Sequence, residues 1–434
     1  MTGNATLDNG GYTGYFSNPI TSAYTVTFQG TGTTVIGGAN TPSSTTIAAG
    51  TLALNTGASL ANSISIANGA TYDISNGAAN PSLSSINAVA GSSIELGNQN
   101  LSLGSGTVAG NLLDGGLSTL TGASVTKTGP GTLTLSGVND YSGGTSLNAG
   151  IIAIGNPSAL GTSSVTFGGG GLQLAGAYTV ANPLVLAAAQ PSGLDLNNYD
   201  GTFTGVISAG GNTFSVTNSG GVAKTLTLTG VNTYSGTTSI GSKVVLALNN
   251  NGTIGTSALS FADNTAIFDI SGISASSLTM GSLNSAQGQI SLGAKTLSLG
   301  SNSATAFGGT IQDGGVAGGT GGSLSKTGSG ILTLSGNNNY SGGTSVNAGT
   351  IAIGHANALG TSSVTLGGGG LQLAGAYTVA NPLVLAAAQP SGLDLNNYDG
   401  TFTGIISGGG DTLRVVPPLP LELCKSVTMA RREM

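Results

Sequence analysis

Residues 127–155 restrict the fold of this chain more than any other stretch. They read KTGPGTLTLSGVNDYSGGTSLNAGIIAIG, with apolar residues alternating with small polar ones. This period of two is typical of a β-strand with one buried face. Glycines mark the segment ends, where we expect turns that need positive φ. The stretch recurs at 326–354, and a shorter version begins at Lys224. The pattern predicts short strands joined by glycine turns.

A long internal repeat surrounds this stretch. Residues 127–211 match 326–410 at 73 of 85 positions, and the upstream halves match more loosely, so the chain is close to two blocks of roughly 200 residues. Such near-identity indicates a recent duplication and carries no information about selected function. Leu147, Phe167 and Val206 become Val346, Leu366 and Ile405 in the second copy. Because these positions stay apolar, we expect them to point inward.

The strand pattern continues over more than 350 residues without a boundary. No helical period accompanies it, so a sandwich, a barrel and a solenoid are the alternatives. Continuity and repetition favour the solenoid, in which each coil pairs with the next and apolar residues stack inside. The sequence therefore predicts an all-β parallel β-helix. Candidate strands in the first copy are Thr132–Leu135, Ile151–Ile154, Ser164–Phe167, Leu172–Leu174, Leu184–Leu186 and Thr202–Ile207.

Three segments differ in composition and divide the chain. Residues 1–32 hold five of the 20 aromatic residues, which predicts an N-terminal cap or a truncated coil of the same architecture. Residues 33–414 carry the repeats and are expected to form the β-helix. Residues 415–434 depart from the pattern, and we expect an aberrant, disordered tail.

Few charges are available for binding or chemistry. Charged residues make up 6% of the chain, against about 25% in ordinary soluble proteins, and the net charge is −6. Nucleic-acid binding needs clustered Lys or Arg, which are absent from the sequence. Cys424 is the single cysteine, so no disulfide framework exists. No apolar run is long enough for a membrane-spanning helix. Met1 begins no cationic or apolar leader, so we expect no signal peptide in this sequence.

The search for catalytic and metal-binding residues returns none. His355 is the single histidine, which argues against Ser-His or Cys-His nucleophilic pairs and, with one cysteine, against zinc. The loop 194–201, which contains Asp195 and Asp200, recurs at 393–400. It could bind calcium through its oxygens, but its spacing differs from an EF-hand loop, and an Asp/Asn turn between coils is the favoured interpretation. We expect Lys127 and Lys326 to be exposed turn lysines that discourage edge pairing.

The repeated stretch resembles a known family. The segment 127–137, together with Asn139, Tyr141, the run 143–145 and Gly150, is similar to the autotransporter-associated β-strand repeat, also called the passenger-associated transport repeat. The resemblance implies a right-handed parallel β-helix in the passenger of a type V secreted protein. It also implies a parent with an outer-membrane β-barrel and a location at the cell surface or outside the cell.

These observations favour a structural passenger solenoid that supports export and adhesion or display and is not an enzyme. No catalytic, cofactor-binding or metal-binding residue is assigned, and no cofactor is expected. Expected partners are host or environmental glycans or proteins, whose identity no motif records. The alternatives are a β-helical carbohydrate-active enzyme, which would need clustered acids, and a gene fragment without function.

The end of the chain generates a prediction about its gene. Alignment of the two copies calls for a Lys224-like strand after Val415, yet the chain continues with three prolines among residues 417–420, and four of its nine cations lie beyond residue 413. Prolines lack the N–H group that a ladder needs. We expect a frameshift near codon 416, so that another frame of the downstream DNA resumes a Lys-Thr-Leu-Thr-Leu-like strand. If neither alternative frame resumes it, the tail is genuine.

Overall fold

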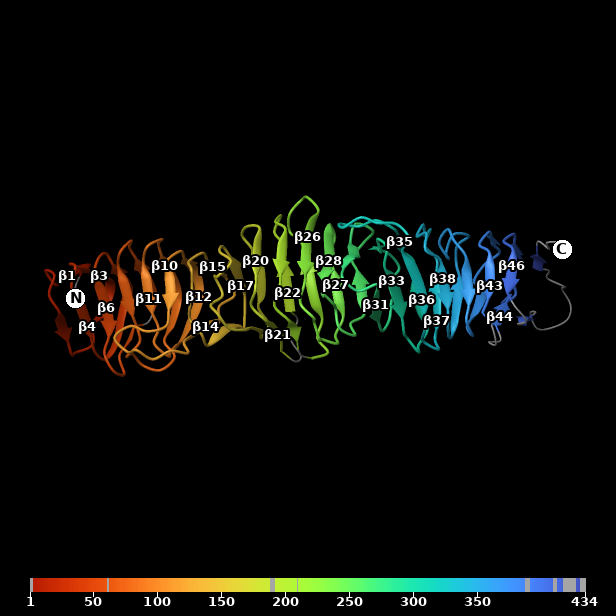
Figure 1. The fold of residues 1–434 in the computed structure, drawn as a ribbon. Coiled ribbons are helices and arrows are strands. Elements are labelled where there is room, and N and C mark those ends of the chain that lie inside the picture. The colour runs from red at the N-terminus through yellow and green to blue at the C-terminus, as the bar shows by residue number, and fades with distance from the viewer. Residues whose placement is uncertain are drawn as a thin grey trace. The chain divides into compact units, whose positions relative to one another are not determined.

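Every regular element in the described part of the chain is a β-strand, as the sequence predicted. The computed structural model describes residues 3–60, 62–187, 192–208, 210–386, 391–408, 412–416 and 427–429. Two compact units divide the chain, Met1–Asn212 and Thr213–Met434. The boundary falls near the end of the first copy of the repeat. Figure 1 labels the strands of both units.

The first unit holds strands β1 to β24, most of them three or four residues long. They are β1 (Ala5–Asp8), β2 (Gly14–Phe16), β3 (Thr21–Gln29), β4 (Thr33–Ile36), β5 (Ala39–Ile47), β6 (Thr51–Leu54), β7 (Ser59–Leu60), β8 (Ser63–Ile66), β9 (Thr71–Asp73), β10 (Ser82–Ala88), β11 (Ser93–Glu95), β12 (Asn100–Val108), β13 (Asn111–Leu113), β14 (Ser124–Lys127), β15 (Thr132–Leu135), β16 (Gly144–Leu147), β17 (Ile151–Ile154), β18 (Val165–Phe167), β19 (Gly171–Leu174), β20 (Tyr178–Val180), β21 (Leu184–Leu186), β22 (Ser192–Asp195), β23 (Gly201–Phe203) and β24 (Ile207–Ser208).

The second unit holds strands β25 to β48. They are β25 (Phe214–Thr217), β26 (Lys224–Leu228), β27 (Thr238–Ile240), β28 (Val244–Asn250), β29 (Leu259–Phe261), β30 (Ile267–Ile273), β31 (Ser277–Met280), β32 (Gln289–Ser291), β33 (Thr296–Leu299), β34 (Thr305–Phe307), β35 (Thr310–Gln312), β36 (Ser323–Lys326), β37 (Ile331–Leu334), β38 (Thr344–Val346), β39 (Thr350–Ile353), β40 (Val364–Leu366), β41 (Gly370–Leu373), β42 (Thr378–Val379), β43 (Leu383–Leu385), β44 (Ser391–Asp394), β45 (Gly400–Phe402), β46 (Ile406–Gly408), β47 (Leu413–Val416) and β48 (Val427–Met429).

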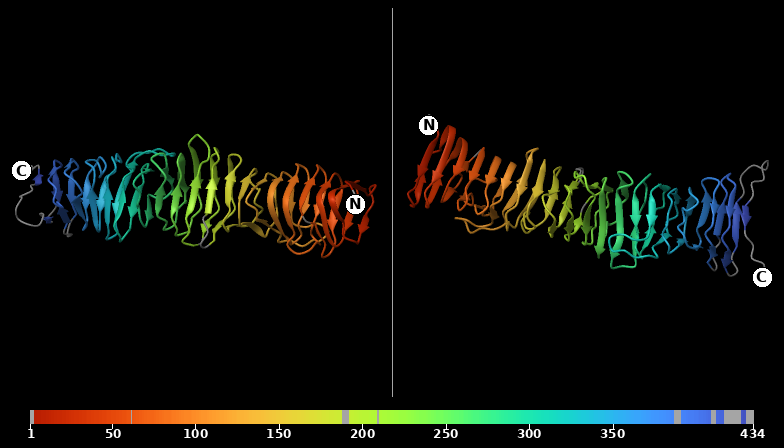
Figure 2. Two further views of the ribbon diagram at one scale, coloured as in Figure 1. Left: turned by 180° about the vertical axis from the view of Figure 1, so that it is seen from behind. Right: turned by 90° about the horizontal axis from the view of Figure 1, so that it is seen from above.

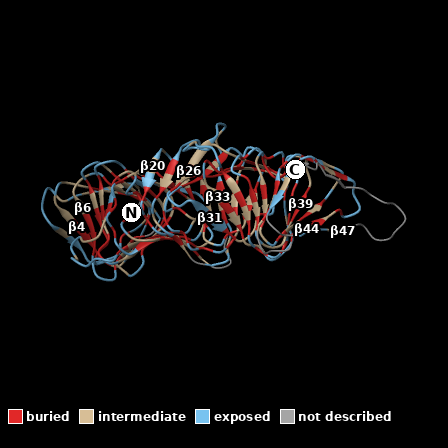
Figure 3. Cartoon of the chain, turned by 45° about the vertical axis from the view of Figure 1, so that its right-hand side comes forward, coloured by how far each residue is buried: buried red, intermediate tan, exposed pale blue. Residues whose placement is uncertain are grey.

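Strands about 20 residues apart pair in parallel, so each unit is a β-solenoid. In the first unit β15, β17, β19 and β22 stack in register, which aligns Leu133, Ile152, Leu172 and Leu194. All four are at most 2% exposed. Burial of one such side chain contributes roughly 1.5–3 kcal/mol. The inward column of aliphatic residues is therefore the hydrophobic core of each coil, and Figure 3 shows this buried interior in red.

The second unit repeats the same column. Strands β37, β39, β41 and β44 align Leu332, Ile351, Leu371 and Leu393, all buried. Small polar residues alternate with them and face outward, as period-two patterning requires. The views in Figure 2 show the successive coils of each unit edge-on. The predicted fold class, a parallel β-solenoid, is confirmed.

Several glycines of the repeated stretch are needed for space between coils. Among those of 127–155, Gly144 and Gly150 have positive φ, of 93° and 64°. Gly129 does not, and a Cβ built there would lie 2.7 Å from the carbonyl oxygen of Gly104 in the preceding coil. The expectation of positive φ at each segment end was therefore wrong for Gly129. Close backbone approach also demands glycine.

One predicted strand and one predicted core position are wrong. The segment 202–207 is not a single strand, because a bend at Gly205 separates β23 from β24. Val206 lies in this connection and is 39% exposed, and its counterpart Ile405 is 51% exposed. Their apolar character therefore does not reflect a place in the core. The inward prediction is confirmed for Leu147, Phe167 and their counterparts, which are fully buried.

Both ends of the chain contain paired strands. β1 pairs in parallel with β3, and β2 pairs with β4, so coil-like pairing begins within residues 1–32. β47 pairs with β44, and β48 pairs with β45, where the sequence predicted disorder from residue 415. The rest of the predicted tail, residues 417–426 and 430–434, lies outside the described residues.

Paired substitutions in β15 test which way its side chains point. Leu133→Asp should lower the free energy of unfolding by several kcal/mol, because an unpaired carboxylate would enter the core. Thr134→Asp, at the neighbouring outward position, should cost less than about 1 kcal/mol. Urea denaturation of both variants measures the difference. Equal destabilisation would contradict the inward and outward assignment.

Candidate functional site

Lys127 and Lys326 occupy core positions, and the prediction that they are exposed was wrong. Lys127 is fully buried, and its strand register places it between Leu103 and Leu147. Its aliphatic stem extends an apolar column, which long charged side chains can do. Its Nζ donates to the turn carbonyl of Gly129 and to that of Ala149 at 3.3 Å. The alternation in the sequence could not distinguish a buried lysine that bonds turn carbonyls from an exposed lysine in a turn.

Burial has the same electrostatic effect on both lysines. Lys326 is 1% exposed, and its Nζ donates to the carbonyl of Gly328. Desolvation lowers the pKa of Lys127 and of Lys326, because burial disfavours the charged ammonium. Both ammonium groups donate hydrogen bonds to turn carbonyls, which carry partial negative charge. This arrangement closes the turn before β15 and the equivalent turn before β37.

Asn139 ties together three successive coils. Its Oδ1 accepts a hydrogen bond from the Leu112 amide at 2.9 Å, and its Nδ2 donates to the Ala159 carbonyl at 2.5 Å. The side chain is 2% exposed. Asn338 does the same with the Ile311 amide at 2.8 Å and the Ala358 carbonyl at 2.6 Å. These amide side chains satisfy backbone groups that the turns would otherwise leave unpaired.

A buried tyrosine and threonine complete the signature. The Tyr141 hydroxyl lies 2.6 Å from Thr145 Oγ1, and Thr145 donates to the Leu160 carbonyl at 3.0 Å. Tyr141 therefore donates to Thr145, since the threonine proton is already used. Desolvation raises the pKa of Tyr141, and the hydrogen bond to Thr145 opposes the shift. Burial likewise raises the pKa of Tyr234, in the copy that begins at Lys224, to about 12.

The signature residues thus hold the solenoid together. Lys127, Asn139, Tyr141 and Thr145 are at most 2% exposed, so they present almost no surface to a ligand. In the partial copy Lys224 is half-buried, while Asn232 and Tyr234 remain buried. Any binding function must therefore lie on the outward side chains and on the loops.

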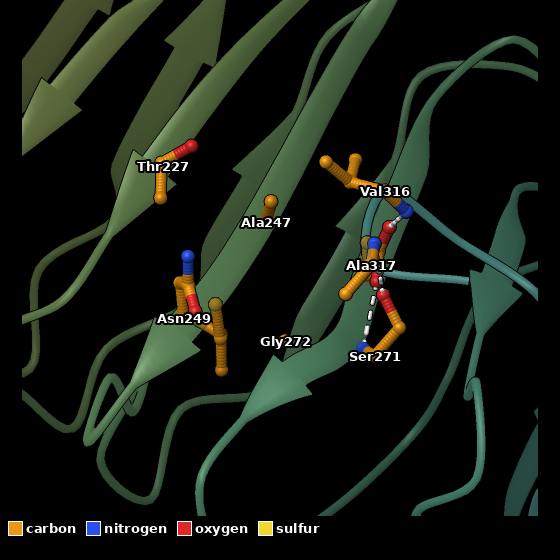
Figure 4. Close-up of a pocket in the computed structure, with 9 residues that line it drawn as sticks. Thr227, Ala247, Asn249, Ser271, Gly272, Val316 and Ala317 are labelled. Atoms are coloured by element: carbon orange, nitrogen blue, oxygen red, sulfur yellow. Dashed lines mark hydrogen bonds between the residues drawn. The ribbon is translucent and has the colours of Figure 1, made fainter. Parts of the chain in front are cut away.

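The most distinctive loop in the second unit is anchored on a buried carboxylate. Asp269 in β30 is 1% exposed and accepts hydrogen bonds from the amides of Ser271, at 2.7 Å, and Val316. Ser271 Oγ accepts from the Ala317 amide at 3.0 Å. Figure 4 shows these bonds, which fasten the loop that follows β35 against β30. In Figure 1 the same teal loop runs back over the upper edge of the green strands.

A cavity of about 190 Å³ lies beside this anchor. Its lining includes Thr227, Asn249, Asp269 and Val316. Figure 4 shows Thr227 and Asn249 on one side and Val316 on the other. This volume falls below the roughly 300–1,000 Å³ of most small-molecule sites. The oxygens of its carboxylate and of Ser271 already accept backbone N–H groups. The arrangement positions an exposed loop and offers little chemistry of its own.

The first unit contains the same loop anchor, a buried Asp followed two residues later by a Ser, with a further carboxylate beside it. Asp73 accepts from the Leu117 amide at 2.7 Å, and Ser75 Oγ accepts from the Ser118 amide at 2.8 Å. Glu95 pairs in register with Asp73. Burial, followed by repulsion from Asp73 and Asp140, raises the pKa of Glu95. The recurrence of Asp-Ile-Ser at 73–75 and 269–271 was visible in the sequence, but its anchoring role was not.

The candidate acidic residues form turns. Asp195 Oδ1 accepts from the Asn197 amide at 2.9 Å, and its Oδ2 accepts from Gln173 Nε2 at 2.9 Å. Asp394 repeats both contacts in the second unit. Asn197 and Asn198 have positive φ, of 46° and 71°. The interpretation of this loop as an Asp/Asn turn is confirmed.

The remaining candidates bring no catalytic or metal-binding group together. His355 Nδ1 accepts from the Asn357 amide at 3.0 Å in a half-buried loop. Within the described ranges, no three His, Cys, Asp or Glu side chains gather in a way that could hold a metal ion. The described residues contain no helix with the length and apolar character needed to cross a membrane. Cys424 lies outside the described residues.

The fold and the buried signature residues define a repetitive parallel β-solenoid. Comparison with known proteins shows the family to which it belongs. Residues 26–54, 125–154, 223–242 and 324–353 match the model of the passenger-associated-transport-repeat. The Adhesin BmaC autotransporter of Brucella suis biovar 1 (strain 1330) is 32% identical over 359 residues. That match covers 73% of this chain and 9% of the Brucella protein. No solved structure matches significantly.

The chain belongs to the passenger-associated-transport-repeat proteins and represents a passenger segment of an autotransporter. The matched segments include Asn139 and Asn338, whose side chains link successive coils as described above. They also include the buried Asn232, whose Nδ2 donates to the Thr253 carbonyl at 2.7 Å. The match at 26–54 identifies a fourth repeat, which the sequence analysis did not single out.

The buried tyrosines predict a loss of stability in alkali. Because the pKa of Tyr141 is raised in the folded state, its stabilising effect is complete below the unfolded value of about 10 and is lost as the pH rises through the folded value. Tyr141→Phe should therefore show a shallower decline of unfolding free energy between about pH 10 and pH 12, by up to about 1.4 kcal/mol per pH unit. Urea titrations at constant ionic strength measure it.

The control for this prediction is Tyr12→Phe, since the Tyr12 side chain is 80% exposed and its hydroxyl is in water in both states. The lowered pKa values of Lys127 and Lys326 act in the opposite direction but are common to both variants, so they cancel in the comparison. An alkaline profile of Tyr141→Phe that coincides with that of the wild type would contradict the assignment.

Proposed function

We propose that this chain serves as a passenger solenoid that supports export and presents an adhesive surface outside the cell. The observation that carries the proposal is the burial of the repeat signature. Lys127 and Asn139 use their polar groups in hydrogen bonds between coils, and the Tyr141 hydroxyl is bonded to Thr145 within its own coil. The repeats therefore act as scaffold, and the outward Ser, Thr and Asn side chains, with the anchored loops, are left for contact.

The similarity to an adhesin supports this proposal. The Brucella relative is named an adhesin autotransporter, and this chain spans about 9% of its length. An adhesin needs extended, rigid surface rather than a catalytic cleft, and stacked coils supply such surface. We place the parent protein at the cell surface or outside the cell, with an outer-membrane export domain as its partner and a glycan or protein as its target.

We further propose that the segment performs no catalysis. Polysaccharide cleavage on β-helices requires paired acids or a basic group at a cleft. Asp195 and Asp394 are instead committed to turn amides and to glutamine side chains. The carboxylates near Glu95 include the buried Asp73, which anchors a loop. A structural and adhesive role accounts for all of these contacts.

Surface display of the chain tests the proposal. The 434-residue chain would replace the passenger of a bacterial autotransporter that keeps its own signal peptide and export domain. We expect the chain to become accessible to external protease and to raise bacterial attachment to host-cell monolayers above that of the empty carrier. Attachment equal to the empty carrier, with the chain demonstrably at the surface, would contradict adhesion. Failure to reach the surface would contradict support of export.

A further inference from the structure

A polar hollow of about 470 Å³ opens on the outward face of the second unit. Hydroxyl and amide side chains from four successive coils line it. They are Thr237, Ser260, Ser282, Asn284, Ser303 and Thr305. Its volume lies within the roughly 300–1,000 Å³ of small-molecule sites, unlike the cavity beside Asp269. It is therefore the better candidate for a binding site on this unit.

An interruption of the β-ladder explains the hollow. Between β29 and β34 the chain crosses this face through isolated bridges, Leu259 with Leu283 and Ser285 with Phe307. In the first unit the strand in the same place, β10, pairs through full ladders with β8 and β12. Leu259 and Leu283 remain 1% exposed and close the floor. The core is thus intact, and only the outward layer is recessed.

The polar groups in the hollow are available to a ligand. Within the described residues, the hydroxyls of Ser260, Ser282 and Thr305 form no hydrogen bond to protein. Asn284 accepts the Ala306 amide through its Oδ1 at 3.3 Å, which leaves its NH₂ group as a donor. Hydroxyls both donate and accept, so this lining can satisfy a ligand that itself carries many hydroxyls.

The lining also limits the charge of the ligand. None of the described residues that line the hollow is ionisable. A sulfated, sialylated or phosphorylated ligand would have to shed water without gaining an opposite charge, which is costly. An uncharged ligand rich in hydroxyl groups exchanges water for side-chain hydrogen bonds at little loss.

We propose that this hollow binds a neutral oligosaccharide. The inference rests on the proposed adhesive function and assigns its ligand class and location. Ser260, Ser282 and Thr305 supply hydroxyl contacts, and Asn284 supplies the amide donor. The lining residues come from successive coils at the interruption, so the sugar chain lies across the interrupted ladder.

Binding of the purified full chain to a printed array of neutral, sialylated and sulfated oligosaccharides tests the proposal. We expect saturable binding to neutral glycans. We expect no binding that requires the sialic acid or sulfate groups of the acidic glycans. Ser260→Leu fills the hollow from the central position of β29 and should weaken binding at least about tenfold, a loss of about 1.4 kcal/mol. The double variant Ser282→Ala with Thr305→Val removes hydroxyls while keeping shape, and should also weaken it.

The matched control is Ser345→Leu, which alters the equivalent central, half-buried position of β38 away from the hollow. It should bind like the wild type, and thermal unfolding of each variant confirms that it is folded. The absence of neutral-glycan binding by folded wild type, binding of acidic glycans alone, or undiminished binding by folded Ser260→Leu would overturn the proposal.

Attachment of displaying cells separates this inference from the proposed function. If Ser260→Leu abolishes glycan binding and lowers attachment, both hold. If the wild-type chain promotes attachment but binds no neutral glycan, the glycan site is refuted while adhesion stands. If the purified chain binds neutral glycans through the hollow but the displayed chain promotes no attachment, adhesion fails and the site stands.

Discussion

The structure depends on satisfying the backbone carbonyls and amides at the turns between coils with very few charges. Parallel ladders satisfy the strands, but each turn leaves groups that must find partners inside a crowded interior. Asn139 bridges amide and carbonyl groups two coils apart, and Lys127 reaches turn carbonyls from a core position. These side chains fix the register of each coil on the next, because a shift of one residue would separate them from their backbone partners.

The internal position of these side chains has consequences for function. Because the recurring side chains of the repeat are internal, the outer face can vary without loss of the fold. In the second unit one such variation recesses the ladder at Leu283 and creates the hydroxyl-lined hollow. In both units a buried Asp fastens a loop to the outer face.

Alternation and repetition were sufficient to predict short strands with one buried face, apart from the strand expected at 202–207, and the absence of a helical pattern. They failed where the type of a residue does not determine whether it is buried or exposed. Lysine is usually exposed, so only the register beside Leu103 and Leu147 revealed that Lys127 is internal. Val206 was misplaced because a bend at Gly205 resets the alternation. The anchored loops and the hollow depend on contacts between coils, which a linear pattern does not record.

The Asn of the signature acts as a staple between coils, and amide hydrogen exchange at Leu112 measures this contact in solution. The Leu112 amide donates to Asn139, and the Ile311 amide donates to the equivalent Asn338 in the same molecule. We expect Asn139→Ala to accelerate exchange at Leu112 by at least about tenfold, because a buried donor loses its acceptor, while Ile311 keeps its slow exchange. Unchanged protection at Leu112 in this variant would contradict the staple.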